Sequence, residues 1–107
     1  MQSDLVYEAR AEVLKAMAHP SRLKMLDALE KGERCVCELQ KLVGSDLSTV
    51  SRHLSVMKAA GIVSIRKHGS NVYYRLRVPC LLRVFGCIEA VLAADAKDRG
   101  RLAKDLA

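Results

Sequence analysis

The chain has 107 residues, a formal net charge of +6 and a hydrophobic content of 50%. This length predicts one domain with a modest core, for which dimerisation is a useful source of further burial. No uncharged run reaches ten residues, so we expect no membrane-spanning segment. The N-terminus lacks a signal-peptide pattern, which predicts a reducing, cytoplasmic location where the four cysteines are thiols or metal ligands.

Helical periodicity predicts four helices in the first part of the chain, at about 4–17, 21–31, 36–43 and 47–60. His19-Pro20 is expected to end the first of these, and Ser21 to cap the second. Asp46 is the expected cap of the fourth helix, which Gly61 should terminate.

After Gly61 the period becomes alternating, which predicts a β-hairpin over 62–77. The helical period returns from Pro79 and predicts a last helix at about 79–95, followed by a frayed tail at 96–107. That last helix carries two apolar stripes, one for the domain's own core and one for a partner. The predicted fold is a single domain, mainly α with a small β-hairpin: a winged helix-turn-helix.

The positive charge is concentrated in one central segment. Between Asp46 and Glu89 the sequence has seven Lys and Arg residues and no acidic residue. Such complete segregation favours a polyanionic partner over an ordinary solvated surface.

The fourth predicted helix is the candidate DNA-reading element. Val50, Leu54 and Met57 cluster on one side and must face inward. The opposite side carries hydroxyl groups and Arg52, which can reach a guanine edge or a phosphate. The residues expected to contact duplex DNA on this helix and the hairpin are Ser48, Thr49, Ser51, Arg52, His53, Ser55, Lys58, Arg66, Lys67, His68, Asn71 and Arg75.

Two other functional classes compete with DNA binding. A winged helix used for protein assembly would show no salt-dependent binding to duplex DNA. An enzyme is not expected, because the sequence has neither a nucleophile–base arrangement nor a phosphate-binding glycine loop.

Cys35 and Cys37 offer a chelating pair for a soft, thiolate-seeking ion. On an ideal helix, side chains two residues apart diverge by about 200°. We therefore expect the pair to bind one ion only if the first turn of the third helix is frayed or unwinds. Because that helix supports the reading helix, unwinding would couple ion binding to loss of the DNA-binding form.

Cys80 and Cys87 lie seven residues apart on the predicted last helix, about 10.5 Å along its axis. They therefore cannot form a disulfide with each other. Either can supply a third thiolate, within its own subunit or across a dimer, or can be a small hydrophobic residue of the interface. His19 is expected to be a structural residue at a helix end.

Over about residues 5–92 the chain resembles the ArsR (ArsR/SmtB) family of metal-responsive bacterial repressors. The motifs that carry the resemblance are Met17-Ala18-His19-Pro20-Ser21-Arg22-Leu23, Gly32-Glu33-Arg34-Cys35-Val36-Cys37-Glu38-Leu39, Ser48-Thr49-Val50-Ser51-Arg52-His53-Leu54, Lys58-Ala59-Ala60-Gly61-Ile62-Val63 and Val72-Tyr73-Tyr74-Arg75-Leu76. The resemblance implies a homodimer joined through the first and last helices. It also implies that the apo-repressor binds an operator palindrome and leaves it when an inducer binds.

The cysteine pattern departs from that of the family. Arsenic-sensing members commonly read Cys-Val-Cys-x-x-Cys, whereas Gln40 stands in the third position here. Cadmium- and lead-sensing members use N-terminal cysteines of the other subunit, and residues 1–34 contain none. The histidines of the zinc-sensing members are also missing from the last helix.

The leading hypothesis is a sensor of trivalent arsenic or antimony that needs no cofactor to bind DNA. Cys35 and Cys37 would be its ligands, with a third from Cys80, Cys87 or a small-molecule thiol. One alternative keeps the fold and senses divalent cadmium, lead or zinc. Another is a persulfide or redox sensor that links cysteines distant in sequence, without a metal.

Overall fold

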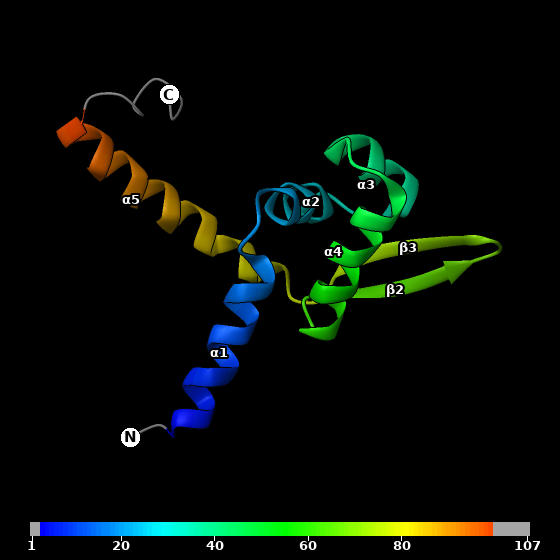
Figure 1. Cartoon of the computed structure of the whole chain (residues 1–107), viewed down its shortest axis with the longest axis horizontal. Coiled ribbons are helices and arrows are strands. Elements are labelled where there is room, and N and C mark those ends of the chain that lie inside the picture. Colours follow the sequence, from blue (N-terminus) through cyan, green and yellow to red (C-terminus); the bar gives the residue numbers. More distant parts are fainter. Residues whose placement is uncertain (1–2, 100–107) are drawn as a thin grey trace.

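The computed structural model describes residues 3–99 of the chain. In chain order its elements are α1 (Asp4–Met17), α2 (Pro20–Glu30), β1 (Arg34–Cys35), α3 (Val36–Val43), α4 (Leu47–Ala59), β2 (Val63–His68), β3 (Asn71–Leu76), the short 3-10 helix η1 (Pro79–Leu82) and α5 (Arg83–Arg99). The fold is mostly helical with one small antiparallel sheet, as predicted (Figure 1).

The sheet has three strands in the order β1-β3-β2, where the sequence predicted a two-stranded hairpin. Strands β2 and β3 form the predicted hairpin, which we call the wing, with Ile65 opposite Tyr74 and Arg66 opposite Tyr73. The additional strand β1 is only two residues long and pairs with β3. A strand this short leaves no alternating pattern, so its existence depends on the pairing partner that folding brings to it.

Residues 20–76, which we call the head, contain most of the core. Met25, Leu26, Leu39, Leu54 and Met57 of the three head helices are each 0% exposed. Burying a side chain of this size contributes about 1.5–3 kcal/mol. Val50, Leu54 and Met57 face this core as predicted, which turns the opposite side of α4 to solvent.

Two helix ends of the head are fixed by side chains. His19, and not Ser21 as predicted, is the N-cap of α2, because its Nδ1 accepts a hydrogen bond from the Ser21 backbone N at 3.0 Å. Pro20 then occupies the first helical position, where a missing N–H costs nothing. Asp46 caps α4 as predicted, accepting from the Thr49 backbone N at 2.7 Å.

Helices α1 and α5, which we call the arms, project away from the head and from each other (Figure 1). The Cα radius of gyration is 15.9 Å, whereas a compact chain of this length would have about 13 Å. The exposed large apolar residues of the arms are Leu5, Val6, Tyr7, Leu14, Ile88, Val91 and Leu92. The arms therefore display the kind of surface that a partner normally covers.

The last helix differs from its predicted extent. The segment predicted as helix from 79 divides into η1 and α5, and α5 continues to Arg99 rather than ending near 95. Residues 96–99 of the predicted frayed tail are thus helical, and the rest of that tail lies outside the described residues. Among residues 3–99 no helix has both the length and the apolar character needed to cross a bilayer.

Candidate nucleic-acid interface and cysteine pair

The outward side of α4 has the shape and chemistry of a DNA-reading surface. Arg52, Ser55 and Lys58 are exposed on it, and Arg52 forms no ion pair among residues 3–99. Ser48 is exposed near the helix start, where its hydroxyl donates to an Asp46 carboxylate oxygen at 3.0 Å. The backbone N–H of Thr49 and the hydroxyl groups of Thr49 and Ser48 lower the pKa of Asp46, so the cap stays ionised. Thr49 and Ser51 are partly exposed at the flanks of this surface.

His53 was predicted to contact DNA, but the structure places it beneath this surface rather than on it. It is only 8% exposed, and its ring centroid lies 4.4 Å from that of His19. The Arg22 Nε donates to His53 Nδ1 at 3.0 Å. Burial, with the nearby charges of His19, Arg22 and Arg52, lowers the pKa of His53. The histidine thus joins α4 to the start of α2 as a neutral acceptor.

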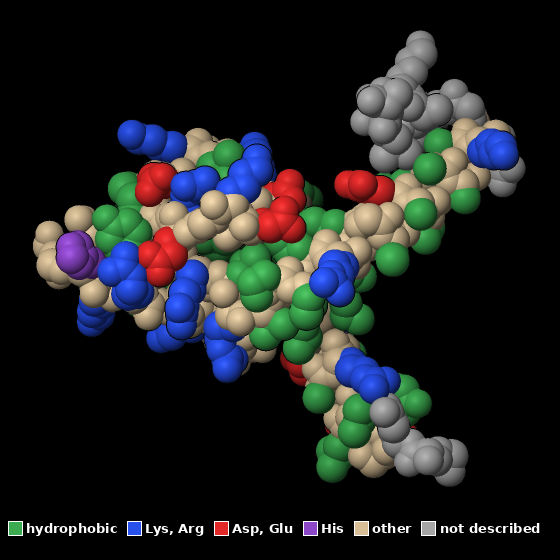
Figure 2. Space-filling view, turned by 180° about the vertical axis from the view of Figure 1, so that it is seen from behind, with side chains coloured by type: hydrophobic (Ala, Val, Ile, Leu, Met, Phe, Trp, Pro, Cys, Tyr) green, Lys and Arg blue, Asp and Glu red, His purple; other side chains and the backbone are tan. Residues whose placement is uncertain are grey.

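The wing presents the remaining predicted DNA contacts to solvent. Arg66, Lys67, His68, Asn71 and Arg75 are all exposed. Figure 2 shows Lys and Arg side chains over the part of the molecule that holds the wing. A reading helix beside a basic, exposed hairpin is the arrangement by which winged helices place one element in a groove and another on the backbone.

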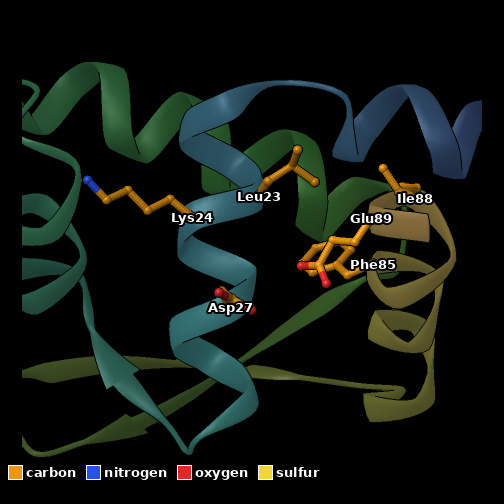
Figure 3. Close-up of a pocket in the computed structure, with 6 residues that line it drawn as sticks. All are labelled: Leu23, Lys24, Asp27, Phe85, Ile88 and Glu89. Carbon is orange, nitrogen blue, oxygen red and sulfur yellow. The ribbon is translucent and has the colours of Figure 1, made fainter. Parts of the chain in front are cut away.

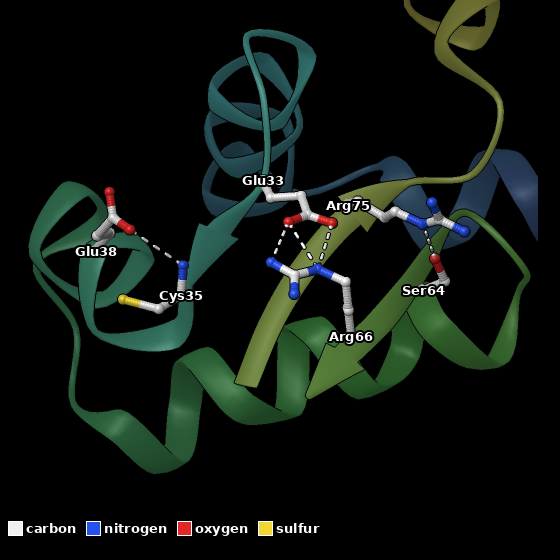
Figure 4. A network of polar contacts seen from close by, with 6 residues as sticks. All are labelled: Glu33, Cys35, Glu38, Ser64, Arg66 and Arg75. Atoms are coloured by element: carbon white, nitrogen blue, oxygen red, sulfur yellow. Dashed lines mark hydrogen bonds and ion pairs between the residues drawn. The ribbon is translucent and has the colours of Figure 1, made fainter. Parts of the chain in front are cut away.

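Two of the wing arginines are already bonded within the protein (Figure 4). Arg66 makes a forked ion pair with Glu33, with a closest N–O distance of 2.8 Å. This hydrogen bonding lowers the pKa of the Glu33 carboxyl. The Arg75 Nε donates to the Ser64 hydroxyl at 3.0 Å. Sequence reasoning missed Glu33, because only the unpredicted strand β1 brings it across the sheet to Arg66.

Cys35 and Cys37 lie together at the start of α3, with their sulfur atoms joined as a disulfide. Cys35 is the N-cap residue and has extended backbone angles (φ −75°, ψ 160°), while Cys37 lies in the first turn. The Cys35 backbone N donates to a Glu38 carboxylate oxygen at 3.2 Å, which holds this junction (Figure 4). The expected unwinding of α3 is therefore unnecessary, because the divergence of about 200° applies only when both residues are helical.

A third sulfur is not near this pair within one subunit. Among residues 3–99 no three His, Cys, Asp or Glu side chains are grouped so that they could hold a metal ion. Cys80 lies in η1 and Cys87 in α5, both exposed and neither in a disulfide. The predicted third thiolate from the same subunit is therefore not in place in this structure.

A shallow apolar groove runs between α2 and α5 (Figure 3). Leu23 of α2 and Phe85 of α5 both project into the space between the two helices, and Ile88 lies on its α5 side. Lys24, Asp27 and Glu89 complete its lining. The groove thus belongs to the junction between the head and one arm, away from the predicted DNA contacts.

Comparison with known proteins gives one match within the head and others along nearly the whole chain. Residues 19–64 match the model described as bacterial regulatory protein, arsR family. The chain is 34% identical over 107 residues to the uncharacterised HTH-type transcriptional regulator Rv0081 of Mycobacterium tuberculosis, covering 99% of this chain and 94% of that one. The crystal structure of Rv0081 superposes with a TM-score of 0.78, at 34% identity over 91% of this chain and 98% of that chain.

A second solved structure bears on assembly. The homodimeric winged helix-turn-helix DNA-binding domain of Mb0332 from Mycobacterium bovis gives a TM-score of 0.74 at 34% identity, and the match covers 94% of each chain.

Shorter matches bear metal- or repressor-related names. The transcriptional repressor SmtB homologue of Synechocystis is 41% identical over 66 residues, which are 62% of this chain and 50% of that protein. The cadmium resistance regulatory protein CadC homologue of Staphylococcus aureus is 40% identical over 67 residues, which are 62% of this chain and 55% of that protein. These relatives are transcriptional regulators and not enzymes.

Proposed function

Because the chain belongs to the ArsR family of bacterial regulatory proteins and is a transcriptional repressor that binds DNA as a dimer, we propose that Cys35 and Cys37 are its inducer site. The inducer we propose is trivalent arsenic or antimony. The observation that carries this proposal is the meeting of the two sulfur atoms at the start of an intact α3.

The donor set suits a soft, thiophilic centre. In the dithiol form, arsenous acid would exchange two hydroxyl groups for the two sulfurs, and each thiol proton would leave with a hydroxyl group as water. The third position on arsenic would keep its hydroxyl group or take a thiol, because no third protein ligand is grouped with the pair among residues 3–99. A thiol from a small molecule or from Cys80 or Cys87 of the second subunit would fill it.

The position of the pair gives binding a route to the DNA surface. Cys35 belongs to β1, which pairs with the wing strand β3, and Cys37 belongs to α3, which packs beside α4. A bound ion would fix the angle at which β1 enters α3. If this angle differs from the one that DNA requires, the binding energy of the ion acts against the DNA-bound form.

The dimer proposed here forms through α1 and α5. Leu5 and Val91, one on each arm, are 74% and 68% exposed, while the head buries its large apolar side chains far more completely. A second copy of the same chain would cover this apolar surface and place two reading helices on the two halves of an operator palindrome.

Operator release and thiol counting test the inducer site together. The DNA would be a duplex selected by the wild-type protein from a randomised pool, and release by arsenite would be followed by fluorescence anisotropy. We expect arsenite to release wild-type protein and to protect two thiols per subunit from a thiol reagent. Cys35→Ser and Cys37→Ser should each bind the duplex normally but resist arsenite.

The double variant with Cys80→Ser and Cys87→Ser is the matched control. It should still respond to arsenite, at a higher concentration if either residue donates across the dimer. If Cys35→Ser protein were released by arsenite as readily as the wild type, the proposed site would be wrong. Release of the wild type by cadmium, lead or zinc salts, and not by arsenite, would instead establish the divalent alternative.

The disulfide between Cys35 and Cys37 favours a second candidate function, a redox-responsive repressor. Hydrogen peroxide would oxidise the two thiols to the disulfide and be reduced to two molecules of water. This local pair replaces the predicted link between distant cysteines, since Cys80 and Cys87 are not in a disulfide.

Mass spectrometry would separate the two functions. A redox sensor would release the selected duplex after peroxide treatment, with a loss of about two mass units and recovery by a reductant. An arsenical sensor would release it in the reduced state with arsenite alone. A persulfide sensor would gain sulfur mass on treatment with a persulfide donor.

A further inference from the structure

Glu33 and Arg66 join two parts of the chain that are 33 residues apart in sequence. The Arg66 Nε lies 3.1 and 3.0 Å from the two Glu33 carboxylate oxygens, and Nη2 lies 2.8 Å from one of them (Figure 4). Glu33 immediately precedes β1 and Arg66 lies on β2, so the pair reaches across the middle strand β3. A forked pair of this kind fixes direction as well as distance.

The same side of the sheet carries Cys35, one member of the cysteine pair. Cys35 lies opposite Tyr73, and Tyr73 lies opposite Arg66 on its other side. Directly opposite residues of antiparallel strands share a face. The other row contains Ile65 and Tyr74, and Tyr74 packs against the core, so the row with Cys35 faces outward.

Tyr73 lies on the middle strand, between the cysteine and the arginine. The Arg66 Cζ lies 5.1 Å from the centroid of the Tyr73 ring, within the range of a cation–π contact. A continuous outer row therefore crosses the three strands, from Cys35 through Tyr73 to Arg66. Glu33 is bonded to Arg66 at the end of this row.

This arrangement gives Arg66 a different role from its neighbour Lys67. A carboxylate with three hydrogen bonds to Arg66 offsets its charge, so Arg66 has less to offer a DNA phosphate than an unpaired residue has. Lys67 is exposed and forms no ion pair among residues 3–99. Lys67 can thus meet phosphate while Arg66 stays bonded.

We propose that Glu33 is a positioning residue that clamps the wing, through Arg66, to the strand carrying Cys35. The clamp holds the wing in the orientation that binds DNA. A second part rests on the proposed inducer site: a change at the thiol pair alters the orientation of the wing through the outer row.

Charge exchange at the two positions tests the clamp without any inducer. Glu33→Gln and Arg66→Gln should each weaken binding to the selected duplex by about threefold to tenfold. The double exchange Glu33→Arg with Arg66→Glu should bind within about threefold of the wild type, because it rebuilds the pair with its polarity reversed. Lys67→Gln is the matched control: it removes one positive charge from the same strand and should lower the salt dependence of binding by about one phosphate contact.

Two results would overturn the clamp. Tighter DNA binding by Glu33→Gln would show that Glu33 only competes with phosphate for Arg66. Binding by the double exchange that is weaker than by either single variant would show that Arg66 contacts DNA directly. Thermal melting of each variant, expected to stay close to that of the wild type because the pair is partly exposed, separates these results from misfolding.

The second part is tested with arsenite as the probe. Arsenite should lower the DNA affinity of both proteins, but the factor for Glu33→Gln should be about threefold to tenfold smaller than the factor for the wild type. An equal response in both proteins would overturn the outer row as the route. If arsenite failed to release even the wild type, the proposed inducer would be wrong, while the charge-exchange result would still decide the clamp.

Discussion

The head and the arms use apolar side chains in opposite ways. In the head, Leu39 and Leu54 are 0% exposed, whereas on the arms Leu5 and Leu14 are 74% and 55% exposed. The head therefore stabilises itself, while the arms gain most of their stabilisation from whatever covers them. It follows that one subunit builds the proposed DNA-binding surface, while the proposed spacing of two such surfaces depends on a second subunit.

The largest expected effect comes from breaking the arms. Val91→Asp would put a charge into the surface that we propose to lie between subunits, while Val91 is already 68% exposed in one subunit and so adds little to its folding. We expect a monomer with a folded head and a loss of operator affinity of about 10²-fold to 10⁴-fold, because two linked sites bind far more tightly than one. Sedimentation velocity would measure the oligomeric state, and fluorescence anisotropy would measure the operator affinity.

Leu42→Asp is the matched control for the arms. Leu42 is an exposed apolar residue of the head, at 38%. Its replacement should leave the protein dimeric. A monomeric Leu42→Asp, or a dimeric Val91→Asp, would contradict the assignment of the interface to the arms.

The next largest effect tests the self-sufficient core of the head. Leu54→Ala removes a fully buried side chain from α4 and should cost about 2–5 kcal/mol of unfolding free energy. Leu47→Ala, on the same helix but 50% exposed, should change it by less than about 0.5 kcal/mol. Urea unfolding followed by circular dichroism measures both, and equal losses would show that α4 is not held by its inward side.

A smaller effect separates the charges of the two regions. Arg52→Ala removes an exposed guanidinium from the outward side of α4 and should weaken operator binding by about 1–3 kcal/mol. Lys97→Ala removes an exposed charge from the arm α5 and should leave the affinity nearly unchanged. Anisotropy titrations at several salt concentrations would decide, and similar losses in both variants would point to a diffuse electrostatic surface.

The smallest effect concerns pH. Burial first, and then the charges of His19, Arg22 and Arg52, lower the pKa of His53 from its usual value of 6.5. The unfolded chain therefore takes up a proton at a higher pH than the folded protein does. The contribution of His53 to the free energy of unfolding should be fully present above pH 6.5 and should decline as the pH falls below it. His53→Gln should flatten this decline in urea unfolding at a series of pH values, whereas His68→Gln at the exposed wing tip should not.

Sequence reasoning was most successful where local signals were strong. The capping carboxylate of Asp46 and the inward spacing of Val50, Leu54 and Met57 are sufficient to place helix α4 and its solvent-facing side. It was weakest for His53, because its position on α4 does not reveal that His19 and Arg22 from another helix cover it.

The winged helix-turn-helix fold, the basic segment and the two adjacent thiols could all be predicted from the sequence, because periodicity, charge and spacing are local properties. The placement of Cys35 outside the helix, and the link from β1 to the wing through Glu33 and Arg66, could not. These features depend on pairing between segments distant in the chain. A two-residue strand has hydrogen-bonding partners only because the tertiary structure places β3 beside it.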